Sequence, residues 1–181
     1  IKISVRQLVS FNIPEDSSVS FTSFRNALEG TKGHQTVQKT FQDDKKAEEV
    51  YQKEVTISFD FTTDDFYLDI SGRIDGVMTT PDKTIIHEIK TTNVSLSDIT
   101  RDFSFSHWAQ AKCYAYMYAS FYDLDTVHIM LTYYHRKTRE SKSFTICMTY
   151  QELESFFHSL VFPYINYLRK YMAWILLRDD S

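Results

Sequence analysis

Three charged residues, Asp75, Glu88 and Lys90, stand on two short segments rich in β-forming residues. Pro81-Asp82 lies between the segments, and this pair is typical of a turn because proline fixes φ at the second turn position. In an antiparallel hairpin closed at this turn, Asp75 faces Glu88 with the two Cβ atoms about 5 Å apart. Lys90 is two residues beyond Glu88 and therefore projects from the same face. The pattern predicts two carboxylates and an ammonium group in one place.

Two carboxylates this close repel each other, and the repulsion raises one pKa unless a cation lies between them. A divalent metal ion with oxygen ligands removes the conflict and creates a hydrolytic centre. The alternative for Lys90 is a salt bridge to Glu88 or a solvated strand end. The alternative for Asp75 and Glu88 is a surface cross-strand pair. Opposed like charges destabilise such a pair, so we favour a metal site.

Four short motifs follow one another in an informative order. They are Gly33-His34, Gly72-Arg73-Ile74-Asp75, Glu88-Ile89-Lys90 and Gln110-Ala111-Lys112-Cys113-Tyr114. The series resembles the RecB-like exonuclease branch of the PD-(D/E)xK nuclease superfamily, which combines a histidine in an early helix, a G-x-x-D strand, an E-x-K strand and a Q-x-x-x-Y helix. E-x-K alone is a weak signal, whereas four motifs in order are specific. Segments within residues 3–118 also resemble the nuclease domain that precedes DinG-like bacterial helicases.

The resemblance implies a catalytic centre made of Asp75, Glu88 and Lys90. Lys90 would hold the attacking water or stabilise the negative charge of the phosphate. The implied metal ligands are His34, Asp75, Glu88 and the main-chain carbonyl of Ile89, a set that suits one or two Mg²⁺ or Mn²⁺ ions. The alternative for His34 is a packed or capping residue.

Gln110 and Tyr114 are four residues apart and so share one helix face. The resemblance implies that they bind the substrate by orienting the motif and contacting the DNA backbone. An ordinary amphipathic helix is the alternative. Arg73, Arg101 and Lys112 are equally compatible with phosphate contacts and with solvation.

Periodicity and turn residues predict the element order. We expect helices at 3–12, 20–42, 107–121 and from 150, strands at 53–61, 66–78, 84–91, 126–135 and 141–148, and a long loop at 93–106. Gly30 and Gly33 would break or start the second helix. The order fits the restriction-endonuclease-like α-β-β-β-α-β core of the resembling family, an α/β fold whose central mixed sheet is flanked by helices. All four glycines lie beside His34 or Asp75, which indicates close backbone approaches there.

Length and composition favour one folded domain over residues 1–181, with 43% hydrophobic and 24% charged residues. No run approaches the roughly 18 apolar residues of a membrane span, and the first residues lack the blocks of a signal peptide. We therefore expect a cytoplasmic protein without membrane contact.

Two cysteines cannot supply the four-cysteine iron–sulfur cluster of some RecB-like relatives, so we expect no cluster. The net charge of −4 indicates weak intrinsic DNA binding.

Together these features predict a Mg²⁺- or Mn²⁺-dependent DNA nuclease, with exonuclease or single-strand cleavage in repair or recombination as the preferred mode by analogy. A helicase domain, in the same or a partner chain, is the implied partner. One alternative is a catalytically weak DNA-binding clamp of a helicase. Another is a phosphodiesterase acting on RNA, which is disfavoured because no RNA-specific module is present.

Overall fold

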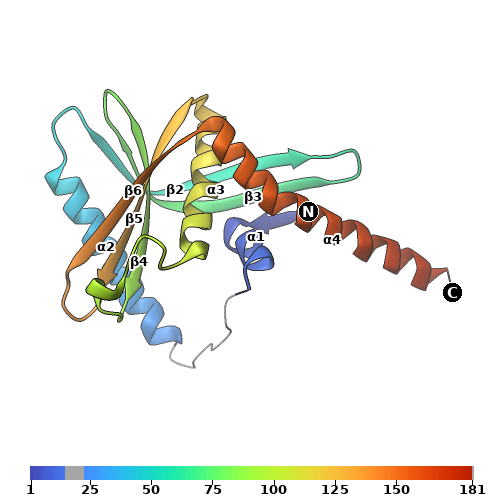
Figure 1. Ribbon diagram of the computed structural model, residues 1–181, viewed down its shortest axis with the longest axis horizontal. Coiled ribbons are helices and arrows are strands. Elements are labelled where there is room, and N and C mark those ends of the chain that lie inside the picture. The colour runs from blue at the N-terminus through green and yellow to red at the C-terminus, as the bar shows by residue number, and fades with distance from the viewer. Residues whose placement is uncertain (15–22, 181) are drawn as a thin grey trace.

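A mixed six-stranded β-sheet organises the chain (Figure 1), and the computed structural model describes residues 1–14 and 23–180. The strands are β1 (Lys2–Ser4), β2 (Val50–Thr62), β3 (Tyr67–Thr79), β4 (Thr84–Thr92), β5 (Thr126–His135) and β6 (Ser141–Thr149). The helices are α1 (Val5–Asn12), α2 (Ser23–Asp44), α3 (Phe105–Tyr122) and α4 (Tyr150–Asp179), with a short 3₁₀ helix at Leu96–Asp98. The succession of α2, β2, β3, β4, α3 and β5 confirms the predicted α-β-β-β-α-β core.

Strand β3 is the centre of the sheet topology. It pairs antiparallel with β2 along its whole length on one edge. Its other edge is shared: β1 pairs in parallel with residues 69–71, and β4 pairs antiparallel with residues 76–79. On this second edge, residues 72–75 therefore have no partner among the described strands. Beyond β4, the sheet continues with β5 in parallel and β6 antiparallel.

Helices cover both faces of the sheet (Figure 1). On one face, Val37 of α2 packs against Ile89 and Tyr134. On the other face, α1, α3 and α4 enclose the larger core, which includes Leu8 and Phe157. Because β4 is buried from both sides, its sequence lacks the polar alternation of a half-exposed strand. Among the helices in the described ranges, none has the length and hydropathy needed to cross a bilayer.

Local structure departs from the sequence-based expectations at several places. The expected helix at 3–12 begins with strand β1, because Ser4 caps α1 and bonds reciprocally with Gln7 in a capping box. Helix α2 continues through Gly30 and Gly33 without a break, and its expected first residues, 20–22, lie outside the described part. The expected loop at 93–106 contains the 3₁₀ helix, and α3 already begins at Phe105.

The β3–β4 hairpin has the predicted register but is shorter than expected. Its four pairs run from Thr79–Thr84 to Gly76–His87, with Pro81 and Asp82 at the tip. Asp75 and Glu88 would form the next pair, yet the ladder ends before them. The expectation of a direct cross-strand pair was therefore wrong, because the two strands diverge at this point.

The close approach of α2 to the sheet depends on Gly33. A Cβ atom at this position would lie 2.5 Å from Cγ2 of Thr91 and 3.0 Å from Cδ1 of Tyr134, whereas a Cβ at Gly30 would meet its nearest atom, Oγ1 of Thr91, at 3.4 Å. We expect Gly33→Ala to lower the free energy of unfolding by about 1–2 kcal/mol through overpacking. Gly30→Ala in the same helix is the matched control, expected to be neutral or stabilising by up to about 1 kcal/mol. Urea unfolding of both variants tests this, and equal effects would contradict it.

Candidate active site

The free edge of β3 is where the predicted catalytic residues meet. Asp75 lies at the end of the unpaired stretch, and its side chain reaches across the gap to β4. Its Oδ2 accepts a hydrogen bond of 2.7 Å from the main-chain N–H of Ile89. The carboxylate thus accepts from a main-chain N–H that a longer β3–β4 ladder would have paired with a main-chain carbonyl. This hydrogen bond fixes Asp75 beside the Glu88–Ile89–Lys90 segment.

Strand β3 reverses its faces at Asp75. Ile74 packs in the large core under α3, whereas Met78, four residues on, packs with Tyr51 on the α2 side. Regular alternation would place these two residues on one face. The neighbouring strand is distorted at the same level, because Glu54 has φ of 56° and is missing from an otherwise continuous β2–β3 ladder. At Asp75, therefore, side chains of β3 no longer alternate regularly between the two faces of the sheet.

His34 reaches the main chain of Ile89 from α2. Its Nε2 lies 2.5 Å from the carbonyl oxygen of Ile89 and 4.0 Å from Oδ2 of Asp75. The main chain of Ile89 is therefore contacted at its N–H by a carboxylate and at its carbonyl by an imidazole. Two of the four predicted metal ligands, His34 and Asp75, thus contact the residue whose carbonyl is the third.

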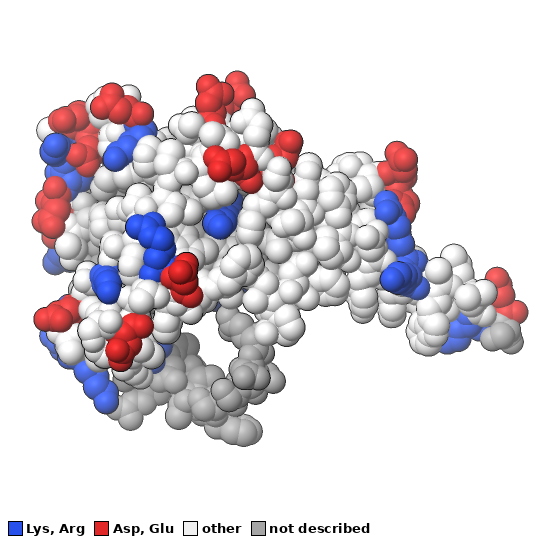
Figure 2. Space-filling model, viewed as in Figure 1, with Lys and Arg blue, Asp and Glu red and all other residues white. Residues whose placement is uncertain are grey.

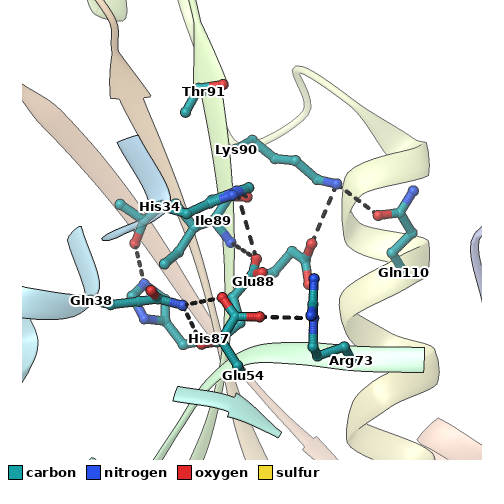
Figure 3. A network of polar contacts seen from close by, with 12 residues as sticks. His34, Gln38, Glu54, Arg73, His87, Glu88, Ile89, Lys90, Thr91 and Gln110 are labelled. Atoms are coloured by element: carbon teal, nitrogen blue, oxygen red, sulfur yellow. Dashed lines mark hydrogen bonds and ion pairs between the residues drawn. The ribbon is translucent and has the colours of Figure 1, made fainter. Parts of the chain in front are cut away.

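Glu88 and Lys90 face α3 on the opposite side of β4 from Ile89 (Figure 3). Nζ of Lys90 lies 3.3 Å from Oε1 of Glu88 and donates a 2.7 Å hydrogen bond to Oε1 of Gln110. Glu88 is only 2% exposed, and its second oxygen, Oε2, has no hydrogen-bond partner within the described residues. A buried carboxylate oxygen without a donor is costly, so this atom marks a place where a cation fits.

Burial dominates the electrostatics of the site. It raises the pKa of Glu88, and the nearby Asp75 carboxylate raises it further, while Lys90 opposes the shift. Burial likewise raises the pKa of Asp75, against the lowering effects of His34 and the Ile89 N–H. Two buried carboxylates whose charged forms are disfavoured are typical of a site completed by a metal ion.

The side chains do not converge into a finished coordination sphere. Within residues 1–14 and 23–180, no three His, Cys, Asp or Glu side chains lie close enough together to hold a metal ion as they stand. The donor set fits a hard divalent ion nonetheless, since it offers carboxylate and carbonyl oxygens with one imidazole. The unsatisfied Oε2 of Glu88 is the atom that would gain most from such an ion.

Tyr114 and three residues that sequence reasoning missed complete the surroundings. Tyr114 is 4% exposed and, with Arg6, lines a cavity beside Asp75. Gln38 is 2% exposed and donates bonds of 2.8 Å to the Asp75 carbonyl and to Oε1 of Glu54. Gln38 could have been found from its position one helical turn after His34. Arg6 and Glu54 carry no comparable sequence signal.

Two of the cations that the sequence left open have structural contacts. Nη1 of Arg101 donates to the carbonyl of Thr145, and Nζ of Lys112 lies 4.8 Å from the centre of the Phe156 ring. On the face shown in Figure 2, basic and acidic side chains are interspersed among large uncharged areas. This face therefore offers no continuous basic track for nucleic acid.

A central mixed sheet that carries these carboxylates and a lysine between flanking helices defines the restriction-endonuclease-like fold. The family model described as the PD-(D/E)XK nuclease superfamily matches residues 13–161, so the chain belongs to this superfamily. The crystal structure of SSO0001 is similar in fold, with a TM-score of 0.57 and 15% sequence identity over 89% of this chain and 75% of that one. No curated protein matches the chain. Membership of the superfamily is confirmed, while the RecB-like branch and the DinG-like association stay predictions.

Proposed function

We propose that this domain is a metal-dependent deoxyribonuclease that hydrolyses phosphodiester bonds, acting from DNA ends or on single strands. The observation that carries the proposal is the state of Glu88, a buried carboxylate with one oxygen paired to Lys90 and the other without a partner in the described part of the chain. Buried polar atoms without a partner are few in folded proteins. Among the described residues, the side-chain atoms in this state are Oδ1 of Asp69 and Oε2 of Glu88, and Glu88 is the one that lies beside Lys90. Superfamily membership supports the nuclease class, and the resemblance alone supports the exonuclease mode and a role in repair.

Mg²⁺ or Mn²⁺ would be held by Asp75, Glu88, the carbonyl of Ile89 and His34. When bound, such an ion lowers the pKa of a water molecule and offsets charge on the phosphate. His34 currently contacts the Ile89 carbonyl through Nε2, which requires a proton on that nitrogen, whereas a metal ligand must donate a lone pair. Coordination through Nε2 would therefore require the other tautomer of the neutral ring, with the proton on Nδ1.

Lys90 is the residue that acts on the reacting groups. Gln110 accepts its ammonium hydrogen bond and thereby fixes the charge next to Glu88. A compact ammonium held in this way suits the orientation of a water molecule or the stabilisation of charge that develops on phosphate oxygens. Tyr114, one turn further along α3, lines the adjacent cavity and is proposed to contact the DNA backbone.

The test uses end-labelled single-stranded and double-stranded DNA, incubated with the protein in Mg²⁺, Mn²⁺ or EDTA beside a Lys90→Ala variant. We expect cleavage only with metal and a reduction of about 10²–10³-fold in the variant, because a preorganised charge near the reacting phosphate is lost. The product ladder distinguishes cutting at ends from internal cutting. Absence of cleavage with every ion, together with unchanged DNA binding in the variant, would favour the non-catalytic clamp.

A further inference from the structure

A cavity of about 460 Å³ opens beside Asp75, on the side of the free β3 edge. Its walls come from α1, α2, β2, β3 and α3, and they include Arg6, His34, Glu54, Arg73, Asp75 and Tyr114. The space is many times the roughly 30 Å³ that one water molecule occupies in the liquid. A sugar–phosphate unit of a nucleic acid is of suitable size.

Arg6 supplies the cavity with a positive charge that no acidic side chain of the described residues pairs with directly. Its side chain is exposed on α1, and it has no hydrogen-bond or ion-pair partner among the described residues. A guanidinium that faces a cavity in this way is suited to bind a phosphate with two parallel hydrogen bonds.

Arg73 also lines the cavity and is held in place by Glu54. Its Nε lies 2.8 Å from Oε2 of Glu54, and the other oxygen of Glu54 accepts from Gln38, which also bonds to the Asp75 main chain. Figure 3 shows Gln38, Glu54 and Arg73 in one continuous series of contacts. Only Nε of Arg73 is used in this series, which leaves the terminal nitrogens of the fork for another acceptor. Glu54 offsets much of the charge of Arg73, so Arg6 is the stronger anion-binding group.

We propose that Arg6 and Arg73 form a binding subsite for a backbone phosphate of the DNA strand, next to the phosphate that is cut. The inference rests on the proposed nuclease function for the identity of its ligand. Asp75 and Glu54 also line the cavity and would repel the phosphate, but Asp75 belongs to the proposed metal site and Glu54 is paired with Arg73. The subsite would hold the strand in register with Lys90 and Glu88 without reading its sequence.

Binding is measured by fluorescence anisotropy with a fluorescein-labelled single-stranded oligonucleotide in EDTA, over a series of salt concentrations. We expect Arg6→Gln to weaken binding about tenfold at low salt and to reduce the slope of log K against log salt by about 0.7, the value for one phosphate contact on a single strand. Arg6→Lys should keep the slope while losing part of the affinity. Arg73→Gln is expected to have a smaller effect.

Lys170→Gln is the charge-matched control, since Lys170 is exposed on α4 and is not among the residues that line the cavity. The Lys170→Gln variant is expected to keep both the affinity for the oligonucleotide and the slope of log K against log salt. Unchanged affinity and slope in Arg6→Gln would overturn the subsite, even if wild-type protein cleaves DNA in Mg²⁺. If the wild type fails to cleave DNA with any metal ion but the slope still falls in Arg6→Gln, the nuclease proposal fails and the phosphate subsite stands.

Discussion

Replacing Glu88 with glutamine is expected to abolish DNA cleavage and, in the absence of metal, to make the protein more stable at pH 8. The loss of activity should be at least about 10²-fold, because a carboxylate of the proposed metal site is replaced by a neutral group. The gain in stability follows from burial, since Glu88 is 2% exposed and its pKa is raised in the folded protein. The same substitution therefore moves activity and stability in opposite directions.

The sign of the stability change depends on pH. A carboxyl whose folded-state pKa is raised contributes stability that is fully present below its unfolded pKa and is lost as the pH rises through the folded pKa. Glu88 therefore destabilises the metal-free wild type at pH 8, whereas the glutamine of the variant stays neutral at every pH. We expect Tm of the variant at pH 8 in EDTA to be higher by about 3–6 °C, on the basis of roughly 1–2 kcal/mol.

Thermal unfolding of the wild type and the Glu88→Gln variant in EDTA at pH 5 and pH 8 provides the measurement. The difference in Tm between variant and wild type should shrink at pH 5, where Glu88 is protonated in the folded state. Addition of Mn²⁺ should raise Tm of the wild type more than that of the variant, because only the wild type keeps the full ligand set. A variant that is less stable than the wild type at pH 8 would contradict the conclusion that buried Glu88 destabilises the metal-free protein at that pH.

Among substitutions that add one methyl group to a residue of the sheet, Gly76→Ala is expected to be the most destabilising. A Cβ atom at position 76 would overlap with the hydroxyl oxygen of Tyr51 and with Cζ of its ring. Tyr51 is buried, and its hydroxyl lies 2.8 Å from Nδ1 of His87. Burial lowers the pKa of His87 to about 3, so this ring is neutral and its Nε2 bonds at 2.7 Å to Thr132. The added methyl group must displace the Tyr51 ring, which is the first member of this buried series of hydrogen bonds.

We expect a loss of about 2–4 kcal/mol, from overpacking and from one broken buried hydrogen bond, which corresponds to a fall in Tm of about 5–15 °C. A double-mutant cycle with Tyr51→Phe checks the cause. Removal of the hydroxyl gives the methyl group space, so the double variant should lose less stability than the sum of the single variants. Additive effects would show that the clash with Tyr51 is not the reason for the glycine.

The sequence by itself determined the element order and the identity of the candidate site residues. Alternation and turn residues suffice for the order, because strands and helices are specified mainly by local patterns. The E-x-K spacing already places Glu88 and Lys90 on one face of a strand, and the structure has their charged groups 3.3 Å apart. The i, i+4 spacing of Gln110 and Tyr114 likewise fixes a shared helix face. In each case the residues that must meet are few positions apart in the chain.

Only the tertiary structure decided how Asp75 enters the site. The sequence predicted a cross-strand pair with Glu88, whereas the carboxylate bonds to the Ile89 main chain across a gap in the β3 edge. That gap exists because β1 and β4 share one edge of β3, and the face reversal beside it lies at the level of Glu54, whose φ is positive. Arg6 reaches the same cavity from the N-terminal helix. These features depend on contacts between distant segments, for which a local sequence pattern carries no signal.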